Sequence, residues 1–503
     1  MQSSDTQRPR IVIVGGGFTG VCAAVQAVRL SHQPLALTVL DPAEQPGLGL
    51  AYRSADPDHR LNAPTFVHSM LPGDAWHFSR WCAQQELAAT DPQAWRADGS
   101  SYIRRSDFGR YIGATLREHS QGWPSGATIT HRRDLAVGLA GGPGGMQVQT
   151  ALGPPLAADL VLVASGHPLP QLPPACAAGL AAHPAVIEHP LGQPQRLHAI
   201  PAQAKVLLLG SGLTALDILS TLVQRGHRGP IEVVSRHGLR PRPQGPLPAA
   251  LQQALRGDLD SLPPGLVLAR LNGPPPAYLA APALAPDLRQ WVQALRAQIR
   301  QALAAGGSWY SAFDDLRDAV WQLWPTLPAA QQQRFVRTLR PCYDVHRYRS
   351  PPQNEAILQA AVATGQIRFQ AARLQSAAPT AGAAGVAVWL RPRGSSAPVL
   401  RQVDVLINCT GQDATSGRVM NPFLAALLRE GRLRRDPSGI GVEVDAECRA
   451  VGAAGSADPA LRVLGPPSVG SRGDAIGAMF IAAQIHRMLP GALAVLGQRD
   501  AAA

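Results

Sequence analysis

The sequence predicts an α/β protein with parallel sheets that contains two similar strand–turn–helix units. Residues 11–20 read IVIVGGGFTG and residues 206–217 read VLLLGSGLTALD; in both, an aliphatic run ends in a glycine-rich turn before a helical pattern. Strand and helix patterns alternate along other parts of the chain, as in parallel sheets covered by helices. The 503 residues, 46% hydrophobic and 16% charged, indicate a globular chain large enough for about two or three domains.

The first unit has the spacing G-x-G-x-x-G. Its glycines are Gly15, Gly17 and Gly20. In this pattern the first glycine permits a tight turn, the second lets the backbone approach a pyrophosphate, and the third lets the helix pack closely. We expect a strand at 11–14, a helix at about 18–30 and a second strand at 35–41 that ends in Asp41. A carboxylate at that point can accept hydrogen bonds from ribose hydroxyls, so the unit predicts a dinucleotide site.

The second unit is G-S-G-L-T-A. Its turn residues are Gly210, Gly212 and Ala215, and alanine is a permitted variant at the third position. The next strand, 231–235, ends in Ser235 and Arg236 rather than in an acid. An arginine there can pair with the 2′-phosphate of NADP, which an acid would repel. The sequence therefore favours NADPH over NADH, with NADH kept as an alternative.

Two such units predict two Rossmann-like dinucleotide-binding domains, one holding FAD and one binding NAD(P)H, with a helical insertion. We expect residues 1–195 to form the first part of the FAD domain and 375–503 to complete it. Residues 200–370 would form the NAD(P)H domain, with the insertion at about 245–340. Small-residue turns at 164–168 and 409–412 are expected where the chain crosses between the domains. Glycine in these turns lets the backbone lie close to a cofactor, so Gly411 is a cofactor-binding candidate, although each turn could equally be a plain strand exit.

Helical patterns fill the insertion and the end of the chain. Apolar residues three or four apart from Leu288 to Leu303 predict one face of an amphipathic helix. Further helices are expected at 312–323, 329–339 and 475–489.

Several stretches, in order along almost the whole chain, resemble bacterial FAD/NAD(P)-binding flavoproteins of the urate hydroxylase type, which are related to class B flavin monooxygenases. The stretches are GGGFTG (15–20), GLGLAY (47–52), HRLNAP (59–64), GDAWHFSRW (73–81), RRSDFGRYI (104–112), GSGLTALD (210–217), SRHGLRPR (235–242), YDVHRYR (343–349), INCTGQ (407–412) and VLGPPSVG (463–470). The resemblance implies that Gly15, Gly17, Gly20 and Asp41 hold the ADP part of FAD. It also places Tyr52, Leu61, Asn62 and Gly465 among the cofactor-binding residues.

Reduced flavin can pass electrons to a dithiol, to another acceptor or to dioxygen. The six cysteines include no CxxC pair, which excludes the usual dithiol spacing. We therefore predict an FAD-dependent, NAD(P)H-consuming monooxygenase that hydroxylates a small polar, anionic molecule through a flavin C4a-hydroperoxide, with urate as the narrower expectation. N-hydroxylation of an amino acid or amine is one alternative. An oxidoreductase that passes electrons to a partner protein or quinone is another.

The catalytic candidates are Asp74, His346 and Arg347. An arginine could clamp an anionic substrate. In the other interpretation Asp74 pairs locally and Arg347 forms a structural ion pair. We expect no metal site, because no ligand cluster has the usual spacing.

The partners that we expect are a small-molecule substrate and O₂. The net charge of +12 comes from arginines spread along the chain, without a basic helix, so we expect no nucleic-acid partner. The polar start MQSSDTQRPR does not resemble a signal peptide, and we expect no apolar run that approaches the roughly 18 residues of a membrane span. These features predict a cytoplasmic protein without a membrane partner.

Overall fold

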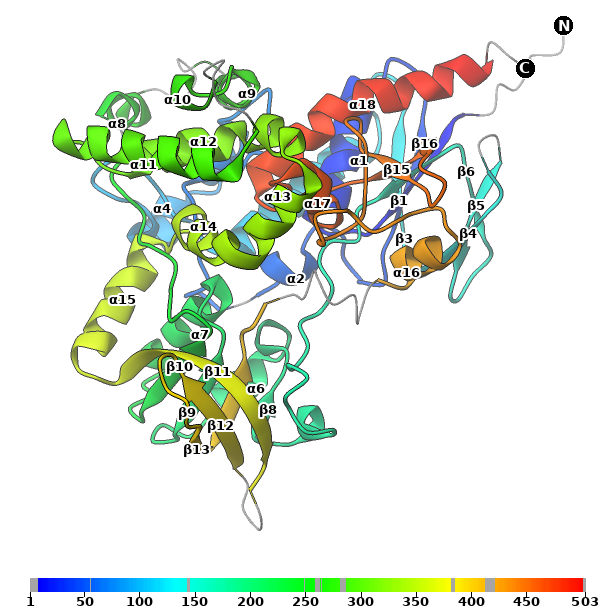
Figure 1. The fold of residues 1–503 in the computed structure, drawn as a ribbon. Coiled ribbons are helices and arrows are strands. Elements are labelled where there is room, and N and C mark those ends of the chain that lie inside the picture. Colours follow the sequence, from blue (N-terminus) through cyan, green and yellow to red (C-terminus); the bar gives the residue numbers. More distant parts are fainter. Residues whose placement is uncertain are drawn as a thin grey trace, which may run out of the picture.

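The computed structural model describes residues 8–54, 56–142, 145–247, 249–257, 263, 265–280, 286–380, 385–411 and 421–500. Three sheets and a group of helices organise this part of the chain (Figure 1). The six-stranded first sheet has the order β15 (Arg449–Val451), β16 (Ala457–Val463), β7 (Leu160–Val163), β1 (Arg10–Val14), β2 (Ala36–Leu40), β3 (Thr128–Arg132). The seven-stranded second sheet has the order β13 (Val399–Val403), β12 (Val386–Pro392), β11 (Ile367–Pro379), β10 (Ile231–Ser235), β9 (Val206–Leu209), β14 (Val405–Asn408), β8 (Val186–Ile187).

The first sheet is buried on both faces. Strand β1 pairs in parallel with β2 and with β7. Ile11 and Ile13 join one hydrophobic core, whereas Val12 and Val14 join another on the opposite face. This arrangement explains why the strand is aliphatic at every position instead of alternating. Helix α1 (Phe18–Leu30) covers one face together with α5 (Arg105–Ser120) and α18 (Ala478–Asp500).

The second sheet repeats this arrangement around β9, which pairs in parallel with β10 and β14. Its helices α7 (Leu213–Gln224) and α15 (Pro352–Ala363) pack on each other. In Figure 1 this sheet and its helices form a lobe below the first sheet. The predicted α/β fold with two such domains is confirmed in the arrangement of these sheets.

The helical insertion lies above the second sheet in Figure 1. Its helices are α8 (Ala249–Arg256), α9 (Leu266–Asn272), α10 (Ala277–Ala280), α11 (Leu288–Ala304), α12 (Tyr310–Leu323), α13 (Ala329–Arg334) and α14 (Arg340–Arg347). Asp287 accepts hydrogen bonds from the N–H groups of Arg289 and Gln290 and so caps α11. A single π-helical turn, 335–339, separates α13 from α14. The helices that we expected here are therefore present, with the third divided into segments.

Shorter helices connect these parts. They are α2 (Gly49–Tyr52), α3 (His77–Gln84), α4 (Leu87–Thr90), α6 (Pro194–His198), α16 (Pro422–Arg429) and α17 (Val469–Arg472).

The sheets differ from the sequence prediction in their antiparallel parts. Strand β11 continues beyond its parallel pairing with β10 and pairs antiparallel with β12, which pairs with β13. These strands and β14 extend the second sheet, so the chain returns to the first sheet after Asn408 rather than at 375. A separate antiparallel sheet of β4 (Ala136–Ala140), β5 (Met146–Thr150) and β6 (Leu156–Ala158) was also not predicted. Half-polar strands such as MQVQT give a weak hydrophobic signal.

Helix α18 corrects the expectation that no apolar run is long enough to cross a membrane. Residues Ala478–Gly497 are long and apolar enough by composition, although most of this segment is buried inside the fold. Because α18 packs on α1, it is the core helix of the first domain.

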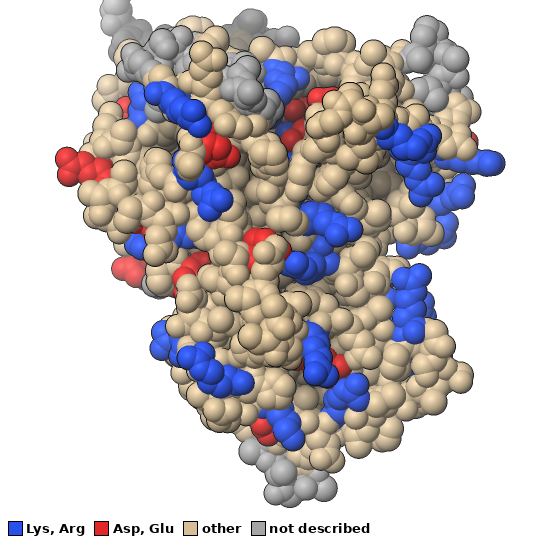
Figure 2. All heavy atoms as spheres, turned by 90° about the vertical axis from the view of Figure 1, so that its left-hand side faces the viewer, with Lys and Arg blue, Asp and Glu red and all other residues tan. Residues whose placement is uncertain are grey.

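Basic side chains are spread over the face of the molecule drawn in Figure 2, with acidic side chains among them.

Candidate cofactor site

The first glycine-rich turn leaves no room for side chains. Gly15 has a φ of 109°, and a Cβ added to it would lie 2.4 Å from the carbonyl oxygen of Ala164. A Cβ on Gly20 would lie 1.8 Å from the carbonyl oxygen of Gly15. The N–H of Gly16 donates to Oδ2 of Asp41 at 2.6 Å, and a Cβ on Gly16 would lie 2.7 Å from Cβ of Asp41. Strand, turn and acid thus form one tightly packed unit.

Helix α1 begins at this turn with free donors. Gly17 is its N-cap in an extended conformation, no side chain caps it, and the first helical turn contains no acidic residue. The N–H groups at the start of the helix are therefore available to a phosphate, and the helix dipole favours its charge. The Asp41 carboxylate accepts hydrogen bonds from the N–H of Gly16 in the turn and from the N–H of Ala43, two residues after Asp41. This donor set, with an acid beside it, fits the pyrophosphate and ribose of a dinucleotide such as FAD.

The second turn has the same construction. Gly210 has a φ of 99°, and a Cβ added to it would lie 2.1 Å from the carbonyl oxygen of Cys409. Gly212 is the N-cap of α7 without a side-chain cap. Ala215, fully buried, stands where Gly20 stands in the first turn.

In each sheet the glycine turn lies against the end of the neighbouring parallel strand. Ala164 follows β7, and Cys409 follows β14. These are the turns that the sequence predicts as crossing points, and after each of them the chain leaves its sheet for the other. Gly411 has a φ of 75°, and no atom lies within 4 Å of the position of an added Cβ; residue 412 lies outside the described residues.

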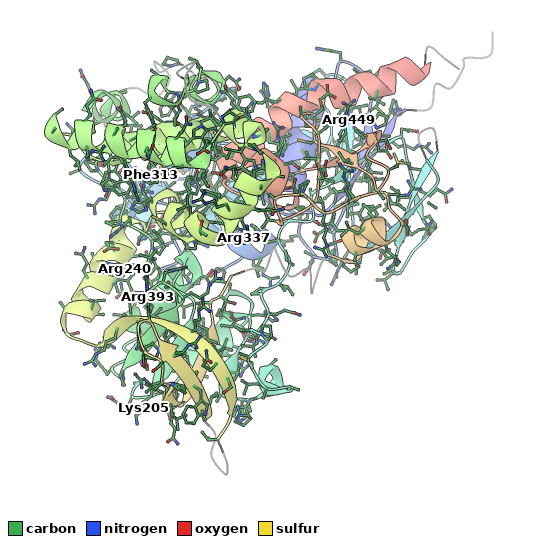
Figure 3. All side chains as sticks on the ribbon, in the orientation of Figure 1. Lys205, Arg240, Phe313, Arg337, Arg393 and Arg449 are labelled. Atoms are coloured by element: carbon green, nitrogen blue, oxygen red, sulfur yellow. The ribbon has the colours of Figure 1, made fainter. Side chains whose placement is uncertain are left out.

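A hollow of about 360 Å³ with a strongly basic lining opens beyond the end of β10. Ser235 is the last residue of β10, and Arg236 follows it. The arginines that line the hollow are Arg236, Arg373, Arg391 and Arg393. Within the described part of the chain, none of the four forms an ion pair with a carboxylate. In Figure 3, Arg393 lies at the opposite end of the second sheet from Lys205, which directly precedes β9.

The positive charge of this hollow affects its histidine. Burial, together with the charges of Arg236, Arg393 and Arg373, lowers the pKa of His237. Of the four arginines, the sequence pointed only to Arg236. The other three belong to β11, β12 and the turn after it, so their common location depends on an antiparallel pairing that was not predicted.

Two of the segments expected beside the flavin lie against the first turn and its helix. A Cβ on Gly49 of α2 would lie 3.4 Å from Cα of Gly17, which places α2 against the start of α1. Tyr52 ends α2 and packs edge-on against Phe108, and burial raises its pKa to about 12. Leu61 is buried, and Asn62 is half-buried. A Cβ on Gly465 would lie 2.8 Å from Oγ1 of Thr19 in α1.

The catalytic candidates already have protein partners. Nε of Arg347 lies 2.7 Å from Oδ2 of Asp474, and the guanidinium lies over the rings of Tyr348 and Phe480. Asp74 pairs with Arg80. None of the ion pairs found among the described residues joins Asp74 to His346 or Arg347.

His346 is held by its own helix and by the insertion. Its Nδ1–H donates to the carbonyl oxygen of Cys342 at 2.7 Å, and its ring stacks on Phe313 with the centroids 4.7 Å apart. Burial lowers its pKa. Figure 3 shows Phe313 in the helical insertion, so this histidine connects α14 to α12.

Helix α14 also carries polar atoms that have no partner. Nη2 of Arg347 and the hydroxyl of Tyr343 are buried and form no hydrogen bond with the residues that the structure describes. Burial raises the pKa of Asp344 to about 6, Asp474 adds to this effect, and Arg340 and Arg347 oppose it. Sequence reasoning did not select Tyr343 or Asp344, because nothing in their spacing distinguishes them from other residues of an amphipathic helix.

Comparison with known proteins agrees with the class of cofactor predicted for this fold. A family described as FAD-NAD(P)-binding matches residues 12–168, which run from strand β1 to the end of the crossing turn after β7. The match covers the part of the chain in which the sequence predicted the FAD cradle. No curated protein sequence matches the chain at a significant level.

Solved structures with the same fold match almost the whole chain. The ornithine N-hydroxylase of Kutzneria sp. 744 is similar with a TM-score of 0.63 and 13% identity, over 98% of this chain and 100% of that one. The L-lysine 6-monooxygenase of Pseudomonas syringae gives a TM-score of 0.63 and 16% identity, with coverages of 97% and 100%. The cadaverine monooxygenase of Erwinia amylovora, bound to FAD, gives a TM-score of 0.61 and 12% identity, over 96% of this chain and 94% of that one. At these identities the similarity establishes the fold, in agreement with the predicted fold class.

Proposed function

We propose that this protein is an FAD-dependent, NADPH-consuming monooxygenase that hydroxylates the nitrogen of a small amine or amino acid. The observation that carries the proposal is the pair of glycine turns, each lying against the end of a crossing strand, in a fold matched over nearly its full length by N-hydroxylating monooxygenases. Two dinucleotide sites in one chain fit a resident flavin and a nicotinamide that reduces it.

FAD fits the first turn. The turn glycines and Asp41 would hold its ADP part, and Tyr52, Leu61, Asn62 and Gly465 would lie along the rest. Bound FAD would accept a hydride from NADPH and activate O₂ for transfer of one oxygen atom to the substrate.

NADPH fits the second turn. Gly210, Gly212 and Ala215 would hold its pyrophosphate, Ser235 its ribose, and Arg236 the 2′-phosphate. The three further arginines of the hollow support this assignment, because four guanidinium groups that pair with no carboxylate in the described part of the chain form a site for a multiply charged anion. The second turn therefore favours NADPH over NADH.

The remaining work of the protein is to position substrate and exclude water. Helix α14 is the best candidate for the substrate side. The unpaired donors of Arg347 and Tyr343 could hold a substrate carboxylate, and Asp344 could face a substrate ammonium. Asp474 would hold the guanidinium of Arg347 in orientation while its Nη2 binds the substrate. Because Asp474 already offsets the charge of Arg347, a clamp on an anionic substrate by Arg347 alone is less favoured than the sequence suggested. Asp74, which pairs with Arg80, and His346, which stacks on Phe313, would support the helices around the site and not contact the substrate.

An amine substrate is favoured over urate. The structural relatives named above act on ornithine, lysine and cadaverine, and none of them is described as a urate hydroxylase. Passage of electrons to a dithiol is disfavoured, although the thioredoxin reductase of Lactococcus lactis has a similar fold (TM-score 0.51, 10% identity). All six cysteines are free thiols; Cys342 is exposed, and Cys176 is half-buried.

The test measures NADPH and O₂ consumption by the purified flavoprotein with ornithine, lysine, cadaverine and urate, together with mass spectrometry of the products. We expect an amine to accelerate both consumptions and to gain one oxygen atom on nitrogen. Acceleration by urate with a hydroxylated ring would replace the amine assignment. Protein that binds no flavin under any condition would refute the proposal.

A further inference from the structure

Five buried polar side chains form a cluster where the two dinucleotide domains meet. The first domain contributes Asp56, His59 and Arg105, and helix α7 of the second contributes Asp217 and Thr221. We call this set the interdomain cluster. Nη2 of Arg105 lies 2.8 Å from Oδ2 of Asp217, with 14% and 3% of the two side chains exposed. Asp56 and His59 expose 7% and 3% of their side chains, and Thr221 is fully buried.

The donors and acceptors around Thr221 and His59 can be assigned from the carboxylate of Asp56, which can only accept. The hydroxyl of Thr221 donates to Oδ2 of Asp56 at 2.7 Å. Its oxygen is then free to accept from Nε2–H of His59 at 3.1 Å, which leaves Nδ1 of His59 to accept from the Ser54 hydroxyl at 2.7 Å. Each donor in this series of hydrogen bonds therefore has an acceptor. The series joins the two domains through Thr221, which belongs to the second domain.

The position of Arg105 points to a role beyond its own helix. It is the first residue of α5, where a positive charge opposes the helix dipole. Its backbone N–H donates to the carbonyl of His59, and its Nε donates to the carbonyl of Arg60. A cation in this position is unfavourable within its own domain, and the carboxylate that neutralises it, Asp217, comes from the other domain.

The cluster lies on the helix that follows the second glycine turn and, in the first domain, beside residues expected along the flavin. Asp217 and Thr221 are one helical turn apart on α7, the helix whose N-terminus forms the second glycine turn. His59 directly precedes Arg60 and Leu61, and Leu61 and Asn62 are among the residues expected beside the flavin. Gln244 of the second domain also donates to the carbonyl of Asn62 at 2.6 Å. A shift of α7 against the first domain would therefore move one cofactor turn relative to the other.

We propose that the interdomain cluster fixes the orientation of the second dinucleotide domain against the first and thereby positions the hydride donor relative to the flavin. The five residues are positioning residues, because they act through the placement of α7 and not by contact with the reacting atoms. The second half of the proposal rests on the proposed function; the first half concerns the fold alone. Buried charged and hydrogen-bonded groups fix geometry because a displaced partner leaves them unsatisfied.

The test uses D217N and T221V, singly and combined, in the full-length protein. Asp217→Asn keeps the size of the side chain and removes the charge that neutralises Arg105. Thr221→Val keeps the shape and removes the hydroxyl that joins Asp56 to His59. Hydrogen–deuterium exchange of segments 54–62 and 213–224 reports the domain contact without any cofactor. Stopped-flow measurement of the reduction of bound flavin by NADPH gives the limiting rate of reduction and the NADPH dissociation constant separately.

We expect faster exchange in both segments and a fall of about tenfold or more in the limiting reduction rate of the double variant, since small misplacements of reacting groups have effects of this size. The NADPH dissociation constant should stay unchanged, because the second glycine turn and the arginine hollow are intact. If the double variant does not fold, T221V alone, which removes one hydroxyl, decides by the same readouts.

Asp134→Asn is the matched control. Asp134 is equally buried and pairs with Arg132 at 3.3 Å, but both belong to the first domain. D134N should leave exchange at 54–62 and 213–224, and the reduction rate, as in the wild type. Unchanged exchange in D217N/T221V would overturn the proposal, and so would a rise in the NADPH dissociation constant with no loss of limiting rate. Wild-type protein without flavin would refute the proposed function, while the exchange measurement would still decide the role of the cluster in domain orientation.

Discussion

The two glycine turns share a backbone and differ in how closely they are surrounded. In the first, an added Cβ would meet other atoms within 4 Å at Gly15, Gly16, Gly17 and Gly20. In the second, Gly210 is equally restricted, but a Cβ added to Gly212 would have no atom of the described residues within 4 Å, and Ala215 already carries a Cβ. Beside the first turn, the strand that comes next ends in Asp41, which accepts a hydrogen bond from the turn. Beside the second turn, the strand that comes next ends at the hollow lined by arginines. A closed turn suits a resident cofactor, and an open one suits a cofactor that exchanges in every turnover.

The largest difference is expected at the third position of the turns. Gly20→Ala would place a Cβ against the carbonyl of Gly15, which is rigid backbone, so we expect a loss of about 3 kcal/mol or more in unfolding free energy and loss of bound flavin. Thermal unfolding and the flavin-to-protein ratio measure this.

Ala215→Gly is the control for Gly20→Ala. It should cost only about 1 kcal/mol, as glycine does in a helix, and should leave flavin content unchanged. Flavin loss equal to that of G20A would contradict the view that the first turn is the tighter one.

The acid of the first turn is the next test. Asp41→Ala removes the acceptor for the N–H groups of Gly16 and Ala43, so we expect weaker FAD binding by about 2 kcal/mol, roughly 30-fold in dissociation constant. Titration of the apoprotein with FAD checks this, while NADPH affinity should not change. A loss confined to NADPH would reverse the assignment of the two turns.

Arg236→Gln probes the basic hollow of the second turn. It should raise the dissociation constant for NADPH by about tenfold and leave that for NADH nearly unchanged, because only NADPH carries the 2′-phosphate. Arg368→Gln is the control, an exposed arginine on β11 that is not among the lining residues of the hollow. Equal losses for both nucleotides in R236Q would exclude a 2′-phosphate contact.

The smallest effect on stability is expected at Gly212. Because an added Cβ has open space, Gly212→Ala should change the unfolding free energy by less than about 0.5 kcal/mol. It should nevertheless weaken NADPH binding, since the methyl group would occupy the space that the pyrophosphate needs. Destabilisation without a change in NADPH binding would show that this glycine serves the fold instead of the ligand.

Local patterns predicted the parts of the molecule that depend on neighbouring residues. The helix at 18–30 and the strands around both turns are observed as expected, since each has its signal within a few residues. The grouping of Arg373, Arg391 and Arg393 with Arg236 depends on antiparallel strand pairing, which a single sequence does not specify. The partners of Arg347 and Arg105, Asp474 and Asp217, lie more than a hundred residues away, so only the folded chain identifies them.

The central claim is that the first turn holds FAD and the second delivers the hydride from NADPH. Anaerobic stopped-flow mixing of the purified flavoprotein with NADPH or NADH tests it most directly. We predict loss of the oxidised-flavin absorbance with both nucleotides, at a much lower concentration of NADPH than of NADH, and a loss of this preference in R236Q. A flavin that is not reduced by either nucleotide would contradict the account.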